Sequence, residues 1–457
     1  MACGRVVVVG GGLAGMAAAV ALESAQIPVT LLEARKTLGG RAGSFQDPQT
    51  GEILDNCQHV LLGCCTNLLD FYRRIGVLER IRWERSIRFV DPRGRSHCLW
   101  GIDALPAPLN LTVSAAAFTA LDTFERLSLA RAMLAMLRLS PAGRLALADI
   151  SFGQWLSEHE QPDSLIEKFY ELVLVSALNE DCRRASAAYA IQVFQEGMLF
   201  NSAAYRMGTP ACPLGKLYES LPCRDVRLGA RMTGLRFDGQ RVVGVQIGEE
   251  FLAADAVVLA TTHASLDKWI PAPLLATDRR FDGLDQLETV PILGAHLWFD
   301  RPVLPWPHAA LMGGPLQWLF DKPGEDGHAV HGVISAARDW TAVPKEQCLD
   351  VFVRQIQSTL PSAREAKLIR GVIVIEKRAT FAPLPGVDRL RPAQAPPPGG
   401  ITGLFLAGDY TQTGWPATME GAVRSGYLAA EAVLNQPGRF LVPSLPRQCP
   451  ARWLQRT

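Results

Sequence analysis

The sequence predicts an α/β fold built around a parallel sheet of the Rossmann type, and two stretches of the chain carry this prediction. Near the start, an apolar strand over residues 5–9 runs through a glycine-rich turn into a helix over residues 16–24, and a second strand follows over residues 28–32. Near the other end, a buried strand over residues 401–407 leads into a helix that continues beyond residue 433. Strands that alternate with helices in this way are typical of parallel sheets covered by helices.

The first glycine-rich turn matches the dinucleotide-binding fingerprint in its strand–turn–helix setting. Its first glycine allows the tight turn, the second lets the backbone approach a pyrophosphate, and the third lets the helix pack closely on the strand. The helix N-terminus directs free N–H groups and the positive end of its dipole at the phosphates. The residues predicted to bind are Gly10, Gly12, Leu13, Ala14 and Gly15. The alternative is a purely structural turn in an α/β sheet.

The second strand ends at Glu33, 23 residues after Gly10, where a carboxylate can accept hydrogen bonds from a ribose hydroxyl. An acidic side chain would repel a 2′-phosphate, so FAD or NAD is favoured over NADP.

A second glycine-rich element, Gly39-Gly40-Arg41, follows shortly after Glu33. A buried pyrophosphate carries two negative charges, and Arg35 and Arg41 can offset them where water is excluded. The predicted contacts here are Ala34, Arg35, Gly40, Arg41 and Ala42. The alternative is a surface loop with two solvated arginines.

The element near the other end of the chain supplies a third set of contacts. Gly408-Asp409 at a strand end can place a carboxylate on a ribityl hydroxyl. The start of the next helix, at Thr418, Met419 and Ala422, can direct its dipole at the N1–C2=O edge of a flavin. An ordinary β-α unit is the alternative.

The middle of the chain adds a hairpin and a return strand. Residues 226–237 and 241–248 are predicted to pair around a turn at Asp238-Gly239, and residues 256–260 return the chain to the nucleotide-binding sheet. Val226 is expected to contact the adenine through its backbone.

Composition excludes several classes of protein. The 46 basic and 45 acidic side chains give a net charge of +1 and form no basic stripe, which argues against nucleic-acid binding. The ten cysteines have no metal-ligand spacing, so no metal site is predicted. The first strand begins at residue 5, which leaves no room for a signal peptide, and no window is apolar enough to cross a membrane. A cytoplasmic protein is therefore expected.

These motifs resemble the flavin amine oxidase/phytoene desaturase superfamily, and they spread over nearly the whole chain. The run from Leu54 to Gly63, which contains Cys57-Gln58-His59, and the stretch from Leu68 to Gly76 are similar to the squalene-associated FAD-dependent desaturases. Residue 57 departs from the pattern, because the family has glycine there. If that position requires a positive φ, Cys57 costs some strain.

The resemblance implies FAD as the cofactor, with Cys57, Gln58 and His59 close to the flavin. It also implies a glutathione reductase-like FAD-binding domain, from residues 1–85, 205–265 and 395–437, interleaved with an α+β substrate domain from residues 86–204 and 266–394. Residues 438–457 form a tail.

The family is identified with hydroxysqualene dehydroxylase of hopanoid biosynthesis, so the resemblance implies a long-chain C30 isoprenoid substrate whose allylic hydroxyl is replaced by hydrogen. Residues 115–139 are predicted to form one helix with a broad apolar face, which can enclose the hydrocarbon together with other apolar side chains. These are Trp155, Phe169, Leu172, Leu174, Phe194, Met198 and Leu199. Ordinary helical core is the alternative for each of them.

Such a substrate partitions into lipid, so peripheral contact with the inner face of a cell membrane is expected. The candidate surfaces are the helix over residues 115–139 and the tail around Arg447, Arg452, Trp453 and Arg456. A disordered tail is the alternative. Association with the enzymes that make and cyclise squalene is a further expectation.

His59 is the predicted catalytic residue, because a proton donor must lie near the leaving hydroxyl; the alternative is a histidine that only packs against the cofactor. Glu420 is a second candidate, and Trp415, Tyr410 and Phe381 are candidates for the ring face. Three other functions stay open: desaturation of a carotenoid-type polyene, oxidation of an amine, and a non-catalytic flavoprotein that carries substrate.

Overall fold

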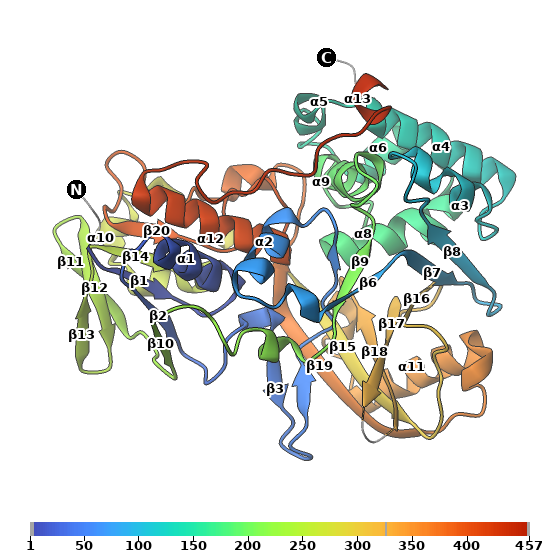
Figure 1. Ribbon diagram of the computed structural model, residues 1–457, viewed down its shortest axis with the longest axis horizontal. Coiled ribbons are helices and arrows are strands. Elements are labelled where there is room, and N and C mark those ends of the chain that lie inside the picture. Colours follow the sequence, from blue (N-terminus) through green and yellow to red (C-terminus); the bar gives the residue numbers. More distant parts are fainter. Residues whose placement is uncertain (1–3, 325–326, 455–457) are drawn as a thin grey trace.

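The computed structural model describes residues 4–324 and 327–454 of the 457-residue chain. Its central layer is a five-stranded sheet in the order β10-β2-β1-β14-β20, and every neighbouring pair is parallel. The sheet joins three segments that lie far apart in the sequence (Figure 1). Its strands are β1 (Val6–Val9), β2 (Val29–Glu33), β10 (Asp225–Leu228), β14 (Ala256–Leu259) and β20 (Leu404–Leu406).

Alternate residues of β1 face two different layers, as the period of a strand requires. Val6 and Val8 pack with the helices α1 (Leu13–Ser24) and α12 (Met419–Leu434) on one face. Val7 and Val9 belong to the core that includes the antiparallel meander on the other face. The meander consists of β11 (Gly234–Asp238), β12 (Arg241–Ile247) and β13 (Glu250–Ala253). The helix α2 (Thr66–Arg74) contacts α12.

A second, seven-stranded sheet lies beside the first (Figure 1). Its order is β19-β15-β18-β17-β16-β7-β8, and all its pairs are antiparallel except β16 with β7. The helix α11 (Lys345–Thr359) packs on it through Cys348, Phe352 and Ile356. Its strands are β7 (Ser86–Val90), β8 (Ser96–Trp100), β15 (Thr289–Phe299), β16 (His308–Leu311), β17 (Trp318–Gly324), β18 (Gly327–Ile334) and β19 (Leu368–Phe381).

A helical lobe lies between β8 and β9 in the sequence, at the upper right of Figure 1. The last helix, α13 (Ala451–Leu454), contacts α4 of this lobe. The helices of the lobe are α3 (Thr112–Ala116), α4 (Thr123–Arg138), α5 (Pro141–Leu145), α6 (Phe152–Glu158), α7 (Asp163–Leu165), α8 (Glu171–Leu178) and α9 (Ala187–Phe194).

Two small sheets complete the fold. One pairs β3 (Ser44–Gln46) with β4 (Ile53–Asp55), and the other has the order β5-β9-β6. The remaining elements are β5 (Leu61–Leu62), β6 (Ile81–Glu84), β9 (Met207–Pro210) and α10 (Ala272–Leu275). Of the helices in the described ranges, none has the length and apolarity needed to cross a bilayer.

All five strands of the parallel sheet fall within residues 1–85, 205–265 and 395–437, and all seven strands of the second sheet fall within residues 86–204 and 266–394. The division into an FAD-binding and a substrate domain stays a prediction. The predicted return of residues 256–260 to the sheet is confirmed, because β14 pairs with β1.

Two predicted elements are wrong in their extent. The helix over residues 115–139 is two helices, because Asp122 caps a new start: it accepts the N–H of Glu125 while the Glu125 side chain accepts the N–H of Asp122. The strand over residues 226–237 is also two elements, since Gly229 takes a left-handed φ of 70° after β10. The hairpin between β11 and β12 is confirmed.

Candidate cofactor and active site

The two glycine-rich turns lie side by side. Gly12 and Gly39 form a bridge, and the Gly39 N–H donates to the carbonyl oxygen of Gly11 at 2.9 Å. A Cβ on Gly40, whose φ is 58°, would lie 3.2 Å from the Cα of Gly12. The two turns therefore form one continuous backbone surface at the carboxyl ends of β1 and β2.

The geometry of the first turn fits a bound pyrophosphate. A Cβ on Gly10 would lie 2.5 Å from the carbonyl oxygen of Ala260, and one on Gly15 would lie 1.9 Å from that of Gly10. By contrast, a Cβ on Gly12 would meet no atom within 4 Å, so this glycine faces open space. No side chain caps α1, and its first turn carries no acid. The uncapped start of this helix, at Leu13 and Ala14, therefore suits an anion.

The Glu33 carboxylate holds the turn by hydrogen bonds and can still accept hydrogen bonds from a ribose. It is nearly buried; its carboxylate accepts the N–H of Gly11 and the N–H of Arg35, each at 2.7 Å. Each carboxylate oxygen can accept a further hydrogen bond. Val226 lies on the neighbouring strand β10, paired with Leu31 of β2, and its backbone contact with an adenine stays a prediction. The side chains of Ala34 and Arg35 are exposed, so the structure does not bury Arg35 at the turn.

An ion pair joins the second turn to the far end of the chain. Arg41 Nη2 lies 2.6 Å from Asp409 Oδ1, and its Nη1 donates to the carbonyl oxygen of Ala379 at 2.6 Å. Burial acts to lower the pKa of Arg41, but the Asp409 carboxylate outweighs it and the pKa is raised. The residues predicted to meet a pyrophosphate and a ribityl hydroxyl thus contact each other. Ala42 is buried behind Arg41.

The helix α12 contacts the Gly408-Asp409 turn through Ser425. Thr418 is the N-cap, and its Oγ1 accepts the N–H of Gly421 at 3.1 Å, while Ala422 donates to the carbonyl oxygen of Thr418. Met419 is the first residue of the helix. The N–H of Gly408 donates to Ser425 Oγ of the same helix at 2.8 Å. These contacts fix the Gly408-Asp409 turn against α12.

Glu420 binds a neighbouring helix. It is fully buried; its carboxylate accepts the N–H of Leu68 and the Nδ2–H of Asn67, both at 2.8 Å. Asn67 and Leu68 lie in the first turn of α2. The structure therefore favours a structural role for Glu420 over a catalytic one.

The segment from Asp55 to His59 lies against the second glycine turn, since Asn56 Nδ2 donates to the carbonyl oxygen of Gly40 at 3.1 Å. His59 Nδ1 is 2.9 Å from the carbonyl oxygen of Cys57. A carbonyl only accepts, so Nδ1 carries the proton, and Nε2 of the neutral ring is an acceptor. Burial lowers the pKa of His59. The side chain can donate a proton from Nε2 only as an imidazolium.

Cys57 shows no backbone strain, because it is not among the described residues with positive φ. Its side chain is buried, and burial raises the pKa of the thiol to about 12. Gln58 donates through Nε2 to the carbonyl oxygen of His59.

Two further histidines, which no sequence motif indicated, lie beside this segment. His296 Nε2 lies 2.9 Å from the carbonyl oxygen of Asp55, and the rings of His296 and His331 are 4.1 Å apart. His331 is fully buried, and neither ring nitrogen has a hydrogen-bond partner among the described residues. Burial, with His296, Lys322 and His59 nearby, lowers the pKa of His331 well below its usual value. No local motif could predict this cluster, because its members lie on β15, β18 and a distant loop.

A small pocket opens beside the Arg41–Asp409 pair. Phe381 and Tyr410, both predicted to line a ring face, contribute to its wall, together with His263, which no motif indicated. The Tyr410 hydroxyl is buried and has no hydrogen-bond partner among the described residues. Trp415 lies elsewhere, packed in the core with Cys64 and Ala204.

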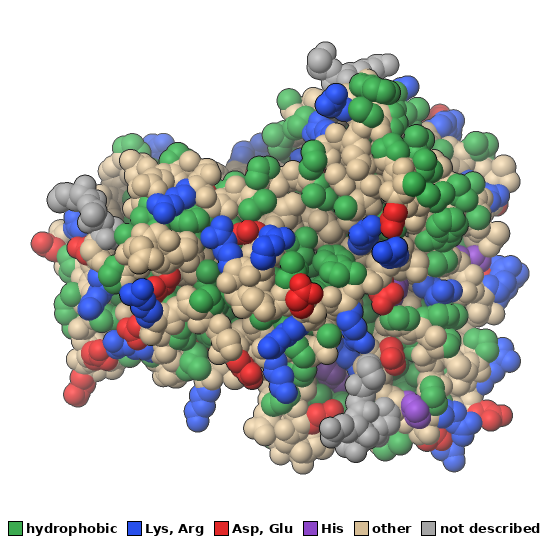
Figure 2. All heavy atoms as spheres, viewed as in Figure 1, with side chains coloured by type: hydrophobic (Ala, Val, Ile, Leu, Met, Phe, Trp, Pro, Cys, Tyr) green, Lys and Arg blue, Asp and Glu red, His purple; other side chains and the backbone are tan. Residues whose placement is uncertain are grey.

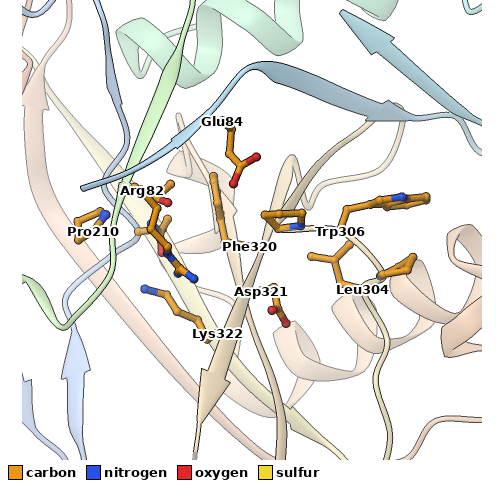
Figure 3. A pocket seen from close by; sticks show the side chains of 12 residues that line it. Arg82, Glu84, Pro210, Leu304, Trp306, Phe320, Asp321 and Lys322 are labelled. Carbon is orange, nitrogen blue, oxygen red and sulfur yellow. The ribbon is translucent and has the colours of Figure 1, made fainter. Parts of the chain in front are cut away.

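A larger pocket of about 310 Å³ lies between β6, β9 and β17, and Gln58 forms part of its lining. Figure 3 shows charged side chains of both signs around it, namely Arg82, Glu84, Asp321 and Lys322. This lining suits a polar occupant better than a hydrocarbon.

The side chains predicted to enclose a hydrocarbon form a packed aromatic core. The rings of Phe169 and Phe194 stack at 6.3 Å, and those of Phe152 and Trp155 at 5.4 Å. The same core cluster includes Leu172, Leu174 and Leu199, and it extends to Phe381 and Tyr410 beside Arg41. Met198 is partly buried against it. The cluster shows apolar continuity from the helical lobe to the cofactor region, and a substrate tunnel stays a prediction.

One group of candidate metal ligands is present in the described part of the chain. Glu171, Asp181 and Cys182 place their ligand atoms within 4.8 Å of one another. Glu171 already accepts the N–H of Cys182 at 3.0 Å, and burial raises the pKa of the Cys182 thiol. The group therefore has a structural explanation: the Glu171 carboxylate caps the turn at residues 181–182.

A parallel sheet with a fingerprint turn, a second glycine turn and a carboxylate from a distant segment defines the class: a dinucleotide-binding flavoprotein. Comparison with known proteins agrees. Residues 13–434 match the family described as flavin containing amine oxidoreductase, and the chain belongs to this family. Its cofactor is FAD, and it is an FAD oxidoreductase.

Two curated relatives cover nearly the whole chain. Hydroxysqualene dehydroxylase of Sinorhizobium fredii is 29% identical over 94% of this chain and 98% of its own length. The 15-cis-phytoene desaturase of Synechococcus elongatus is 26% identical over 94% of this chain and 96% of its own length.

Solved structures share the fold. A redesigned putrescine oxidase superimposes with a TM-score of 0.70 at 16% identity, covering 95% of this chain and all of its own. A putative protoporphyrinogen oxidase from Exiguobacterium sp. 255-15 superimposes with a TM-score of 0.67 at 19% identity, and the match covers 95% of this chain and all of that protein. The predicted fold class, an FAD-binding α/β fold of the amine oxidase type, is confirmed.

Proposed function

We propose that this FAD oxidoreductase reductively removes the hydroxyl of hydroxysqualene to give squalene, in hopanoid biosynthesis. The observation that carries the proposal is the similarity to the hydroxysqualene dehydroxylase of Sinorhizobium fredii over 98% of that protein. The run from Leu54 to Gly63 supports it, because this run resembles the same family at every quoted position except Cys57 and lies against the second glycine turn through Asn56.

When bound and reduced, FAD would supply the hydride that replaces the hydroxyl at the allylic carbon, and that hydroxyl needs one proton in order to leave as water. The chain must bind the cofactor, exclude water and stabilise the positive charge that develops on the substrate. Cofactor binding falls to the two glycine turns, Arg41 and Asp409. Phe381 and Tyr410 offer an apolar and π-rich wall beside that pair, which suits a developing allylic cation.

The proton is assigned to His59. Its Nδ1–H is held by the carbonyl oxygen of Cys57, which fixes the ring and leaves Nε2 as the atom that exchanges a proton. Because burial lowers its pKa, His59 returns to the neutral state readily after it receives a proton, and it donates most readily at acidic pH.

The test is anaerobic mixing of photoreduced holoprotein with hydroxysqualene. We expect the flavin absorbance to return in proportion to the squalene formed, while mixing with squalene leaves the flavin reduced. Bound but unchanged hydroxysqualene would overturn the proposal in favour of a carrier.

Desaturation of a polyene is the second candidate, favoured by the phytoene desaturase of Synechococcus elongatus, which matches over 96% of its length. In that reaction electrons flow in the opposite direction, from substrate to oxidised FAD. Anaerobic mixing of oxidised holoprotein with phytoene distinguishes the two, since bleaching of the flavin supports the desaturase. An amine that bleaches the flavin would instead support an amine oxidase.

A further inference from the structure

The outer face of α4 is apolar where an ordinary surface helix is polar. Phe124, Leu127, Arg131, Leu134 and Arg138 recur at spacings of three and four residues. At about 100° per residue these positions lie within a stripe of about 80°. Phe124 and Leu127 are each 62% exposed and Leu134 is 36% exposed, while Ala132, Met136 and Leu137 on the opposite side are buried in the core. We call these five residues the α4 outer face.

Neighbouring elements extend this apolar surface. The helix α13 contacts α4, and its Trp453 is 74% exposed. Arg126 ties the start of α4 to the end of α3 by donating to the carbonyl oxygen of Ala116, and Val113 of α3 is also exposed. Figure 2 shows hydrophobic side chains gathered over this lobe, with basic side chains among them. Single exposed apolar residues are common, but a grouped set marks a surface for contact.

Both charged residues of the α4 outer face are basic, and the exposed acid Asp122 lies outside it, at the N-cap of the helix. The only acid of α4 is Glu125, which is buried and bound to Lys168 at 2.7 Å, whereas Arg131 and Arg138 lie in the exposed stripe. The whole chain has a net charge of only +1, so this cationic character is local. An occupant must therefore combine an apolar interior with a negatively charged surface.

We propose that the α4 outer face, together with Trp453, docks on an anionic lipid bilayer. The helix would lie in the plane of the membrane, with Phe124, Leu127 and Leu134 inserted at the boundary of the acyl chains. Arg131 and Arg138 would extend to the lipid phosphates while their stems stay among the lipid chains. A symmetric contact between two copies would bring these arginines together, which disfavours a second copy as the occupant. The proposal goes beyond the dehydroxylation and does not rest on it.

The experiment measures co-sedimentation of the full-length holoprotein with phosphatidylcholine vesicles, with and without phosphatidylglycerol. The double variant Phe124→Ser/Leu127→Ser is expected to bind both vesicles at least tenfold more weakly. The double variant Arg131→Gln/Arg138→Gln should lose the preference for anionic vesicles, about fivefold for each arginine. The matched control is Phe251→Ser/Ile369→Ser, which removes two exposed apolar side chains, 49% and 67% exposed, outside the helical lobe.

The control variant should bind as the wild type does, and all variants should keep their flavin absorbance and melting temperature. The proposal is overturned if the wild type does not bind anionic vesicles, or if the α4 and control variants lose binding equally. It is also overturned if sedimentation velocity shows a dimer that only Phe124→Ser/Leu127→Ser dissociates, because the face would then be an interface between copies. Failure of the dehydroxylation assay leaves these outcomes unchanged.

Discussion

At the scale of single residues, the three fingerprint glycines differ in what surrounds them. Gly10 and Gly15 are required because backbone atoms approach them, while Gly12 has no neighbour within 4 Å. The sequence motif predicted the close backbone approach at Gly10 and Gly15, because it depends on local chain geometry that the motif encodes, and the approach of Gly12 to a pyrophosphate stays a prediction. Gly15 is thus required by the fold, whereas Gly12 leaves space for the predicted ligand.

Substituting Gly12 should therefore affect mainly FAD binding, and substituting Gly15 should affect mainly folding. Gly12→Ala is expected to weaken FAD binding at least tenfold and to change the apoprotein's free energy of unfolding by less than about 1 kcal/mol. Gly15→Ala places a methyl group 1.9 Å from the Gly10 carbonyl oxygen and should prevent stable folding. FAD titration of apoprotein and urea unfolding without FAD measure the two effects. Loss of stability in Gly12→Ala equal to that in Gly15→Ala would contradict the distinction.

A proton-donor role for His59 makes the reaction rate depend on pH. Burial lowers its pKa, so a donor role predicts that the single-turnover rate rises as the pH falls toward that pKa. His59→Gln should lower the rate about 10²–10⁴-fold and remove this pH dependence. Flavin absorbance of the purified variant is the control, and it should match the wild type. If turnover and flavin occupancy fall together, His59 only packs against the cofactor.

At the scale of elements, the boundaries show what periodicity misses. Apolar residues recur without interruption over residues 115–139, which indicated one helix. The sequence nevertheless contains the signal for a break, since Asp122 and Glu125 have the spacing of a capping box and form one. A cap is a local hydrogen-bond arrangement and could have been predicted. The exposure of Phe124 and Leu127 could not, because it depends on which side of α4 meets the core.

A buried carboxylate, Glu420, joins α12 to α2, next to the hydrogen bond that the Tyr427 hydroxyl donates to Asp70 at 2.9 Å. Glu420→Gln replaces one acceptor oxygen by a donor NH₂ group, which faces the N–H groups of the α2 start. We expect a loss of about 2 kcal/mol in the free energy of unfolding. Glu365→Gln is the control, because that side chain is 87% exposed and its ion pair with Arg301 contributes little. A variant as stable as the wild type in urea would show that the three hydrogen bonds do not stabilise the contact.

At the scale of the whole molecule, the two ends of the chain meet at Arg41 and Asp409, 368 residues apart. Sequence motifs predicted that both ends contribute to one cofactor site, because each end carries its own fingerprint. They did not predict that these two side chains pair with each other. They also could not predict His296 and His331, since strand pairing in the second sheet brings those residues to the Asp55–His59 segment. Long-range register determines these contacts, and no local pattern encodes it.

Buried histidines make the stability of the whole protein depend on pH. Burial, with the positive charge of Arg88, lowers the pKa of His308 from 6.5 to about 4, and burial also lowers the pKa values of His59, His296 and His331. Between the folded and unfolded pKa the unfolded chain binds the proton and the folded protein does not. The contribution of these histidines to the free energy of unfolding is therefore fully present above pH 6.5 and is lost as the pH falls below it.

For His308 alone, lowering the pH from 6.5 to 5 should decrease the free energy of unfolding by about 2 kcal/mol, at 1.36 kcal/mol per pH unit. Urea unfolding of the FAD-saturated protein at pH 7 and pH 5 measures the loss. His308→Gln keeps an acceptor for the Arg88 N–H that now donates to His308 Nε2 at 3.3 Å, and it should reduce the loss by that amount. His328→Gln, which changes an exposed side chain of β18, should leave the loss unchanged. An equal loss in the wild type and His308→Gln would mean that His308 takes up its proton in the folded state, so water must reach it inside the second sheet.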